Sequence, residues 1–345
     1  MKIYIFLIIM SLIFSMIEIT SEKKRSITII PIIILSLLLA FNTNNFDYEN
    51  YKKMFENPQF YFNSIEKGYL YLIIFLGKIF NNFQVVYIIL GIFFLYVLFK
   101  YKNNYMNCMF LMYFSNNFLS DLPQIRNMFV TLYFSLAFRY LVLGKNFLYI
   151  IIITIAVFFH KIAYLFFIFY IFNKIKKINT YVKLLILCFI FCIFLGKFFD
   201  IIVNNIFFEN KLEYYLILNR LTTKTQFTYY LILILFDIIF LLVGNYKKKV
   251  IDEEKIYIKL ILFPISYMPT TLIVTDLIAR SYRIICFIKW FYYFKYIFPK
   301  NKNNRYLLLS ILILNQIFII IFYLRENYRE TFINLINQLE NNLFF

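Results

Sequence analysis

The sequence predicts an all-α protein, a polytopic transmembrane bundle of about 10–12 spans with interfacial helices in its outer loops. Of its 345 residues, 62% are hydrophobic and only 16% are charged. A soluble domain is about 45–50% apolar and about 25% charged. Apolar runs near the roughly 20 residues that cross a bilayer recur along the whole chain. We therefore expect a single integral membrane domain over 1–345, and we exclude a soluble enzyme, a disulfide-stapled secreted protein and a disordered chain.

The spans are read from these apolar runs in chain order. They are expected near 3–19, 27–41, 85–99, 106–120, 127–143, 147–159, 161–172, 181–200, 227–244, 256–275, 281–298 and 306–323. The run 147–172 forms either one long helix or two short helices that turn at His160. We favour the turn, because it keeps successive basic connections on one side of the membrane. The stretch 68–80 is apolar but short, so we expect an interfacial or re-entrant helix there.

Charged residues orient the spans. The formal net charge is +18, and lysines and arginines cluster in alternate connections such as 23–25, 174–177 and 247–249. The positive-inside rule makes these connections cytoplasmic. Both termini and two sizeable outer loops, 42–67 and 201–226, then lie outside. The excess positive charge is explained by the orientation of the spans in the membrane, so nucleic acid is not an expected partner.

Charged residues at the inner edges of spans need no special site. Glu18 and Arg139 are examples, and both can extend to cytosolic water.

Residue counts exclude several kinds of site. Six glycines leave no glycine-rich phosphate loop, and a single histidine excludes any metal site built on two or more histidines. The four cysteines all lie in apolar runs, where inert thiols are expected; they are Cys108, Cys188, Cys192 and Cys286. We expect no metal and no cofactor.

Arg126 lies at the outer edge of a span, where topology gives no reason for a basic residue. Pro123 breaks the chain before it, so Arg126 falls in the first turn of the next helix. In that position it can bind an anion, because the dipole of a helix N-terminus adds to its charge. Alternatively, it pairs with Asp121 and fastens the turn.

Arg280 and Arg283 share one face of a predicted helix, also at an outer edge. Two guanidinium groups on one face can hold phosphate oxygens in bidentate fashion. Asp276 lies one helical turn before Arg280 and can form an ion pair with it. The alternative is that Asp276 neutralises one arginine while water solvates the other. The clamp is favoured, because two arginines face one acid.

His160 is the only histidine, at the expected outer turn in Phe158-Phe159-His160-Lys161. A lone histidine is often a packed or interfacial residue. With an ordinary pKa near 6.5, it can also serve as a general base. Asp237 lies in the middle of a span, where it is either a proton or ion site or the acceptor of a neighbouring hydroxyl.

The outer loop 42–67 and the residues just after it combine carboxylates with aromatic rings. Such a set suits a sugar, because acids accept from hydroxyls and rings stack on C–H faces. The substrate-binding candidates here are Asp47, Tyr48, Tyr51, Glu66 and Tyr69. The alternative is an ordinary amphipathic interfacial helix with a tyrosine belt. The second outer loop contributes Arg220 without a sharp pattern.

Several of these segments form an ordered set of motifs. They are Asp47-Tyr48…Tyr51, Glu66-Lys67-Gly68-Tyr69, Ile125-Arg126-Asn127, Phe159-His160-Lys161-Ile162-Ala163 and Arg280-Ser281-Tyr282-Arg283. In this order the chain resembles the EpsG-type family of bacterial exopolysaccharide membrane proteins, which is related to the Wzy-type polymerases. The resemblance spans about 47–290. Three positions depart from the family pattern: Lys67 replaces proline, Asn127 replaces glutamine and Ile162 replaces a small hydroxyl residue.

The resemblance implies a glycosyltransferase that polymerises lipid-linked repeat units at the outer face of the bacterial cytoplasmic membrane. We expect it to act without a metal, because the sequence has no compact acidic cluster of the Asp-x-Asp type. A glycan on undecaprenyl pyrophosphate is transferred to the end sugar of a second unit, and the lipid pyrophosphate leaves. Arg126, Arg280 and Arg283 would stabilise that leaving group. His160 would take the acceptor proton, with Asp47 or Glu66 as substitutes. The expected partners are the lipid-linked glycan, the bilayer and other polysaccharide-assembly membrane proteins.

Two other functions stay open beside the polymerase. A transporter or flippase of lipid-linked saccharides would place charged residues along a cavity at mid-depth, where only Asp237 is clear. A membrane O-acyltransferase of glycans would also use one histidine, and it would need a route for an acyl donor from the cytoplasm.

Overall fold

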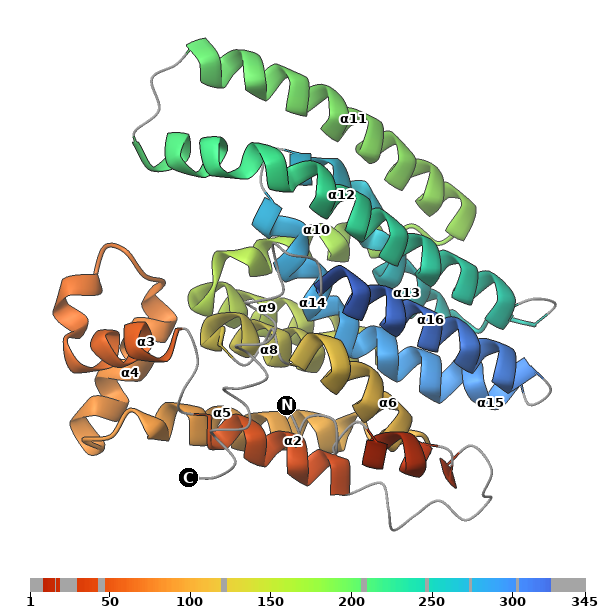
Figure 1. Ribbon diagram of the computed structural model, residues 1–345, viewed down its shortest axis with the longest axis horizontal. Coiled ribbons are helices and arrows are strands. Elements are labelled where there is room, and N and C mark those ends of the chain that lie inside the picture. Colours follow the sequence, from red (N-terminus) through yellow and green to blue (C-terminus); the bar gives the residue numbers. More distant parts are fainter. Residues whose placement is uncertain are drawn as a thin grey trace. The chain divides into compact units, whose positions relative to one another are not determined.

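The described part of the chain is helical throughout. The structure is a computed structural model that describes residues 9–15, 17–18, 30–42, 47–118, 123–205, 210–245, 248–272, 275–301 and 304–323. Within these ranges no β-strand occurs, and the elements labelled in Figure 1 are all helices. The prediction of an all-α protein is therefore confirmed.

The chain divides into two compact units, which are described separately. The first comprises 1–164 and 286–345, and the second comprises 165–285. The helices of the first unit are α2 (Ile30–Ala40), α3 (Tyr48–Glu56), α4 (Lys67–Ile79), α5 (Gln84–Lys100), α6 (Met106–Met112), α8 (Ile125–Val142), α9 (Asn146–Phe159), the end of α14 (Thr275–Tyr292), α15 (Phe298–Lys300) and α16 (Arg305–Tyr323). Its core is rich in aromatic side chains, and Trp290, Tyr87, Tyr101 and Phe94 are among those fully buried.

A tight connection joins α8 to α9. Gly144 has a φ of 74°, a conformation that glycine adopts without strain. The N–H of Lys145 donates to the carbonyl of Tyr140 (2.8 Å), and the N–H of Gly144 donates to that of Leu141 (3.0 Å). This Schellman pattern satisfies the last carbonyls of α8. Helix α9 begins directly afterwards and packs along α8.

The second unit contains most of α10 (Tyr164–Asn173), together with α11 (Ile178–Asn205), α12 (Asn210–Asn245), α13 (Asp252–Leu262) and most of α14. The segment 201–226, expected as an outer loop, is helical at its described residues. It contains no proline or glycine that would end a helix.

The expected span 256–275 is interrupted. Helix α13 ends at Leu262 and is followed by 3₁₀ turns at Phe263–Ser266 and Met268–Leu272. Each turn contains a proline, Pro264 or Pro269, which lacks the N–H that a continuous helix requires. Apolarity alone therefore overestimated the length of this helix.

The predicted break in the run 147–172 is confirmed. Helix α9 ends at Phe159, and His160 has an extended backbone with φ −161° and ψ 131°. A 3₁₀ turn, Lys161–Ala163, then leads into α10. Most other helices begin and end within a few residues of the expected limits, as α5 and α16 illustrate.

Membrane-spanning segments are less clear than the sequence suggests. Among the described residues, one helical segment, Gln226–Asn245, is long and apolar enough to cross a bilayer. Helices α4 and α5 pass the same test together, but they are bent by 117°. Four further apolar helical segments are shorter. The count of about 10–12 spans stays a prediction.

Two charged residues at the expected inner edges of spans form hydrogen bonds with backbone groups of the protein. Glu18 is buried and accepts hydrogen bonds from the start of α6. Arg139 donates through Nη1 to the carbonyl of Lys100, at the end of α5. Both therefore satisfy backbone groups at helix ends, which have no partner within their own helix.

Candidate functional site

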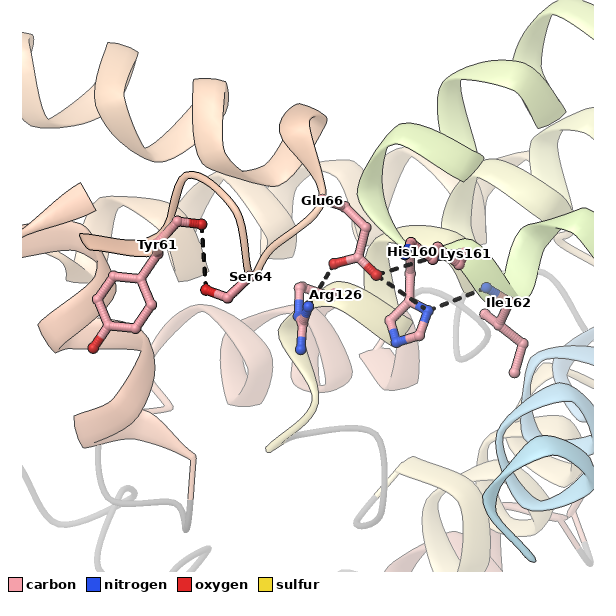
Figure 2. Close-up of polar contacts among 7 residues, drawn as sticks. All are labelled: Tyr61, Ser64, Glu66, Arg126, His160, Lys161 and Ile162. Carbon is pink, nitrogen blue, oxygen red and sulfur yellow. Dashed lines mark hydrogen bonds and ion pairs between the residues drawn. The ribbon is translucent and has the colours of Figure 1, made fainter. Parts of the chain in front are cut away.

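The carboxylate of Glu66 connects three segments that are distant in the sequence (Figure 2). Its Oε2 lies 2.5 Å from Nη1 of Arg126. Its Oε1 accepts a 3.4 Å hydrogen bond from the N–H of Lys161 and lies 3.9 Å from Nδ1 of His160. We call Glu66, Arg126, His160 and this N–H the Glu66 cluster.

Each member of the Glu66 cluster stands at the beginning of a helix. Glu66 directly precedes α4, with φ −63° and ψ 133°. Arg126 is the second residue of α8, and His160 directly precedes the turn Lys161–Ala163. The first N–H groups of a helix lack partners within it and carry a partial positive charge. The site therefore combines the positive ends of three helices with one carboxylate.

Gly68 permits the close approach that forms the cluster. A Cβ atom at Gly68 would lie 2.7 Å from both Cβ and the carbonyl oxygen of Phe158, which belongs to the last turn of α9. Real Cβ atoms do not approach so closely, so only glycine lets the first turn of α4 rest on this backbone. That contact brings Glu66 beside His160 and Lys161.

The imidazole of His160 is held by the backbone that follows it. Its Nδ1 accepts a 3.2 Å hydrogen bond from the N–H of Ile162, as an N-cap side chain does. An accepting Nδ1 carries no proton, so the neutral ring carries its proton on Nε2. In this arrangement His160 offers a donor rather than a base.

The electrostatics of the cluster favour the ionised carboxylate. Burial alone would raise the pKa of Glu66, but the charge of Arg126 and further hydrogen bonds and charges hold it below its ordinary value. For Arg126, burial would lower the pKa, while Tyr51 and Glu66 raise it above the ordinary range. The side chains are 12% (Glu66), 14% (His160) and 24% (Arg126) exposed. All three side chains are therefore partly exposed.

Two buried tyrosines pack together beside Arg126. The guanidinium carbon lies 6.0 Å from the centre of the Tyr51 ring, and that ring packs edge-on against Tyr69 at 5.6 Å. Both tyrosines are buried. Tyr48 stacks on Tyr87 and donates to Oε1 of Gln84 (3.4 Å). These rings pack against protein, and their role in sugar binding stays a prediction.

Asp47 belongs to the same region. It directly precedes α3, and its carbonyl accepts the N–H of Tyr51 at 2.9 Å. Burial raises the pKa of Tyr51, and the negative charge of Asp47 adds a smaller increase. Asp47 thus lies near the tyrosines, and its contact with a sugar is untested.

The other predicted arginines belong to the second unit. Arg280 and Arg283 are helical residues of α14, as expected, and both are half-buried. Nε of Arg283 donates to the carbonyl of Ala279 (3.1 Å). The side chains of Asp276 and Arg220 lie outside the described residues, as does Asp121. A shared clamp of Arg126 with Arg280 and Arg283 stays a prediction.

Asp237 lies in Gln226–Asn245, the part of α12 that is long and apolar enough to cross a bilayer. Its Oδ2 accepts a 2.6 Å hydrogen bond from the hydroxyl of Tyr282, and both residues are buried. Of the two alternatives for Asp237, acceptance of a neighbouring hydroxyl is the one observed. Tyr282 stands between Arg280 and Arg283 in the sequence, so this bond attaches the arginine segment to α12.

Sequence reasoning selected the members of the Glu66 cluster but missed how they pair. Arg126 was expected to bind an anion or Asp121, and Glu66 to bind a sugar. Their shared position just before or inside the first turn of a helix was the available signal.

Among the described side chains, no group of three or more histidine, cysteine, aspartate or glutamate residues could hold a metal ion.

Comparison with known proteins adds the family. The family model described as "EpsG family" matches residues 25–337, most of the chain. No curated protein and no solved structure matches this chain. The matched range includes the whole Glu66 cluster and the arginine segment of α14. The chain therefore belongs to the EpsG family, and it is a membrane protein of exopolysaccharide biosynthesis.

Proposed function

We propose that this protein is a polysaccharide polymerase that joins undecaprenyl-pyrophosphate-linked repeat units at the outer face of the cytoplasmic membrane. A hydroxyl oxygen of the acceptor sugar attacks the anomeric carbon of the donor sugar. The bond from that carbon to the pyrophosphate oxygen breaks, and the pyrophosphate leaves with the electron pair. The acceptor hydroxyl loses its proton to a base.

The observation that carries this proposal is the bridging position of Glu66 between a cation and a titratable ring. Arg126 supplies positive charge where a phosphate group gains negative charge. Its Nε is buried and has no hydrogen-bond partner among the described residues, so one donor is left for a ligand. Glu66 offsets part of this charge, and a share of Arg280 and Arg283 in holding the diphosphate stays a prediction.

His160 can pass a proton in either of two states. While Nδ1 accepts from Ile162, Nε2 holds a proton and can donate to a phosphate or sugar oxygen. When Nδ1 instead carries the proton and donates it to Glu66, Nε2 becomes a base. In that second state the ring leaves the N–H of Ile162 and turns toward Oε1, which lies 3.9 Å from Nδ1 in the structure. Glu66 thereby selects the basic form.

Glu66 acts in this scheme as a positioning residue rather than as the base. Its lowered pKa keeps it ionised at neutral pH and makes it a weak proton acceptor. An ionised carboxylate stabilises the imidazolium that forms when Nε2 takes the acceptor proton. The proton from the acceptor hydroxyl is then held on His160 beside the ionised Glu66, and this transfer requires no metal.

The decisive experiment uses purified protein in lipid vesicles with an undecaprenyl-pyrophosphate-linked oligosaccharide. We expect a ladder of longer products and release of undecaprenyl pyrophosphate. Movement of the intact substrate across the vesicle without a ladder would identify a flippase. Transfer of an acyl group to the glycan would identify an acyltransferase. Either result would overturn the proposal.

Substitution of His160 separates proton transfer from capping. In His160→Asn, the side-chain oxygen can still accept the N–H of Ile162 but cannot transfer protons. We expect both His160→Asn and His160→Ala to lose about 10²- to 10⁴-fold in chain extension. Only the alanine variant should also lose about 0.5–2 kcal/mol of stability, through the lost cap. A wild-type rate for His160→Asn would make His160 a structural residue.

A further inference from the structure

Helix α4 has two apolar faces, and only one of them packs against protein. Leu70, Ile73 and Leu76 are buried in the first unit. On the other face Tyr71, Phe75 and Ile79 recur every four residues and are 59%, 60% and 55% exposed. Residues four apart lie above one another on a helix. They therefore form a continuous stripe, which we call the α4 stripe.

The bend between α4 and α5 limits how this stripe can meet a membrane. Helix α5 has 17 residues and carries one charged residue, Lys100 at its end, which is near the minimum length of a span. The axis of α4 turns from that of α5 by 117°. When α5 runs along the membrane normal, α4 lies closer to the membrane plane than to the normal.

The residues beside the α4 stripe have the chemistry of a membrane interface. Phe60, in the 3₁₀ turn just before α4, is 78% exposed. Nζ of Lys67 lies 5.3 Å from the centre of the Phe62 ring. Lys78 is exposed in the last turn of α4. Exposed aromatic rings with flanking lysines are typical of helices that lie at the boundary between headgroups and acyl chains.

We propose that the α4 stripe lies in the bilayer interface and fixes the depth of the Glu66 cluster at the level of the lipid headgroups. Glu66 directly precedes α4, and Gly68 holds the same end of the helix against α9. A helix lying in the interface therefore carries the cluster at its own depth. The membrane contact of the α4 stripe does not depend on the proposed function. Its benefit for catalysis does rest on that function, because the diphosphate of a lipid-linked substrate also lies at headgroup depth.

Fluorescence quenching by brominated lipids tests the depth of the stripe. Tyr71→Trp, Phe75→Trp and Ile79→Trp are placed singly in vesicles with phospholipids brominated near the headgroup or deeper in the acyl chain. The only native tryptophan, Trp290, is fully buried and gives the wild-type background. We expect all three variants to be quenched above that background, to a similar extent, and more strongly by the shallow bromines.

Two results would overturn this proposal. Quenching no greater than in wild type would mean that the stripe does not contact lipid. Quenching by deep bromines that grows from 71 to 79 would mean a re-entrant helix. Glu49→Trp, on the exposed polar side of α3, is the matched control and should be quenched by aqueous acrylamide instead. The measurement needs no activity, so it can fail or succeed independently of the polymerase assay.

Discussion

Two carboxylates of the first unit accept hydrogen bonds at the start of a helix, yet their surroundings differ. Glu18 accepts from the N–H groups of Asn107 and Cys108 at 2.9 and 3.1 Å, and from the side-chain amide of Asn107 at 2.5 Å. These donors all belong to the start of α6 and are uncharged. Glu66 accepts the N–H of Lys161, and its neighbours include Arg126 and His160.

The comparison separates a structural carboxylate from a functional candidate. Glu18 is 3% exposed, so its donors are sealed from solvent and serve the fold. The Glu66 cluster is partly exposed and contains a fixed cation and an imidazole ring that can carry a proton on either nitrogen. A carboxylate whose partners are charged and reachable can exchange them for a ligand, whereas a sealed cap cannot.

The largest effect should follow from removing Arg126. We expect Arg126→Ala to reduce chain extension by about 100-fold or more, because the guanidinium that would stabilise the negative charge on the leaving pyrophosphate is lost. Arg139→Ala, in the last turns of the same helix, is the matched control and should extend chains normally. Product length on gels, with protein level in the membrane as reference, provides the measurement. Equal polymer from both variants would exclude Arg126 from the mechanism.

Glu18→Ala should affect stability and leave chemistry intact. It leaves buried N–H groups of α6 without an acceptor, which costs about 1–3 kcal/mol. Denaturant unfolding in detergent measures this loss. Chain extension per folded molecule should match wild type. A variant that is stable but inactive would show that the contrast between the two carboxylates is mistaken.

Gly68→Ala tests the contact that places Glu66. The added methyl group would meet the backbone of Phe158, so we expect a loss of about 1–3 kcal/mol and weaker chain extension. Gly77→Ala in the same helix meets only ordinary contacts, the nearest at 3.7 Å from Phe55, and should fold and function normally. Indistinguishable melting curves for the two variants would contradict the close approach at Gly68.

The smallest effect concerns pH. The pKa of Glu66 lies below its ordinary value of 4.5, so its ionisation stabilises the folded state at neutral pH. This contribution is lost as the pH falls through the folded-state pKa. Glu66→Gln should therefore melt lower than wild type at pH 7 and equally at pH values well below 4. A difference that persists in acid would point to packing rather than charge.

The sequence predicted the helices well because they depend on local patterns. Apolar runs and the basic residues between them located α5, α9 and α16 to within a few residues, and the break at His160 followed from the alternation of charge. The interruption after Leu262 was missed because only apolarity was counted there. Pro264 and Pro269 were the local signal.

The site was only half predictable, for a physical reason. Glu66, Arg126 and His160 were each singled out by residue type and position. Their pairing depends on tertiary packing, because Glu66 and Arg126 are 60 residues apart and meet only where α4 rests on α9. No local pattern encodes that contact. The burial of Tyr69 and the bond from Tyr282 to Asp237 are hidden from sequence in the same way.

The interrupted segment after α13 has a consequence for movement within the second unit. Its two 3₁₀ turns are mostly buried where described; both pack against α11, and the second also packs against α12. Irregular backbone tolerates neither acyl chains nor an empty space, since its polar groups would lose their partners. Any rearrangement that admits a bulky substrate must therefore keep the backbone polar groups of these turns paired with protein groups or with water.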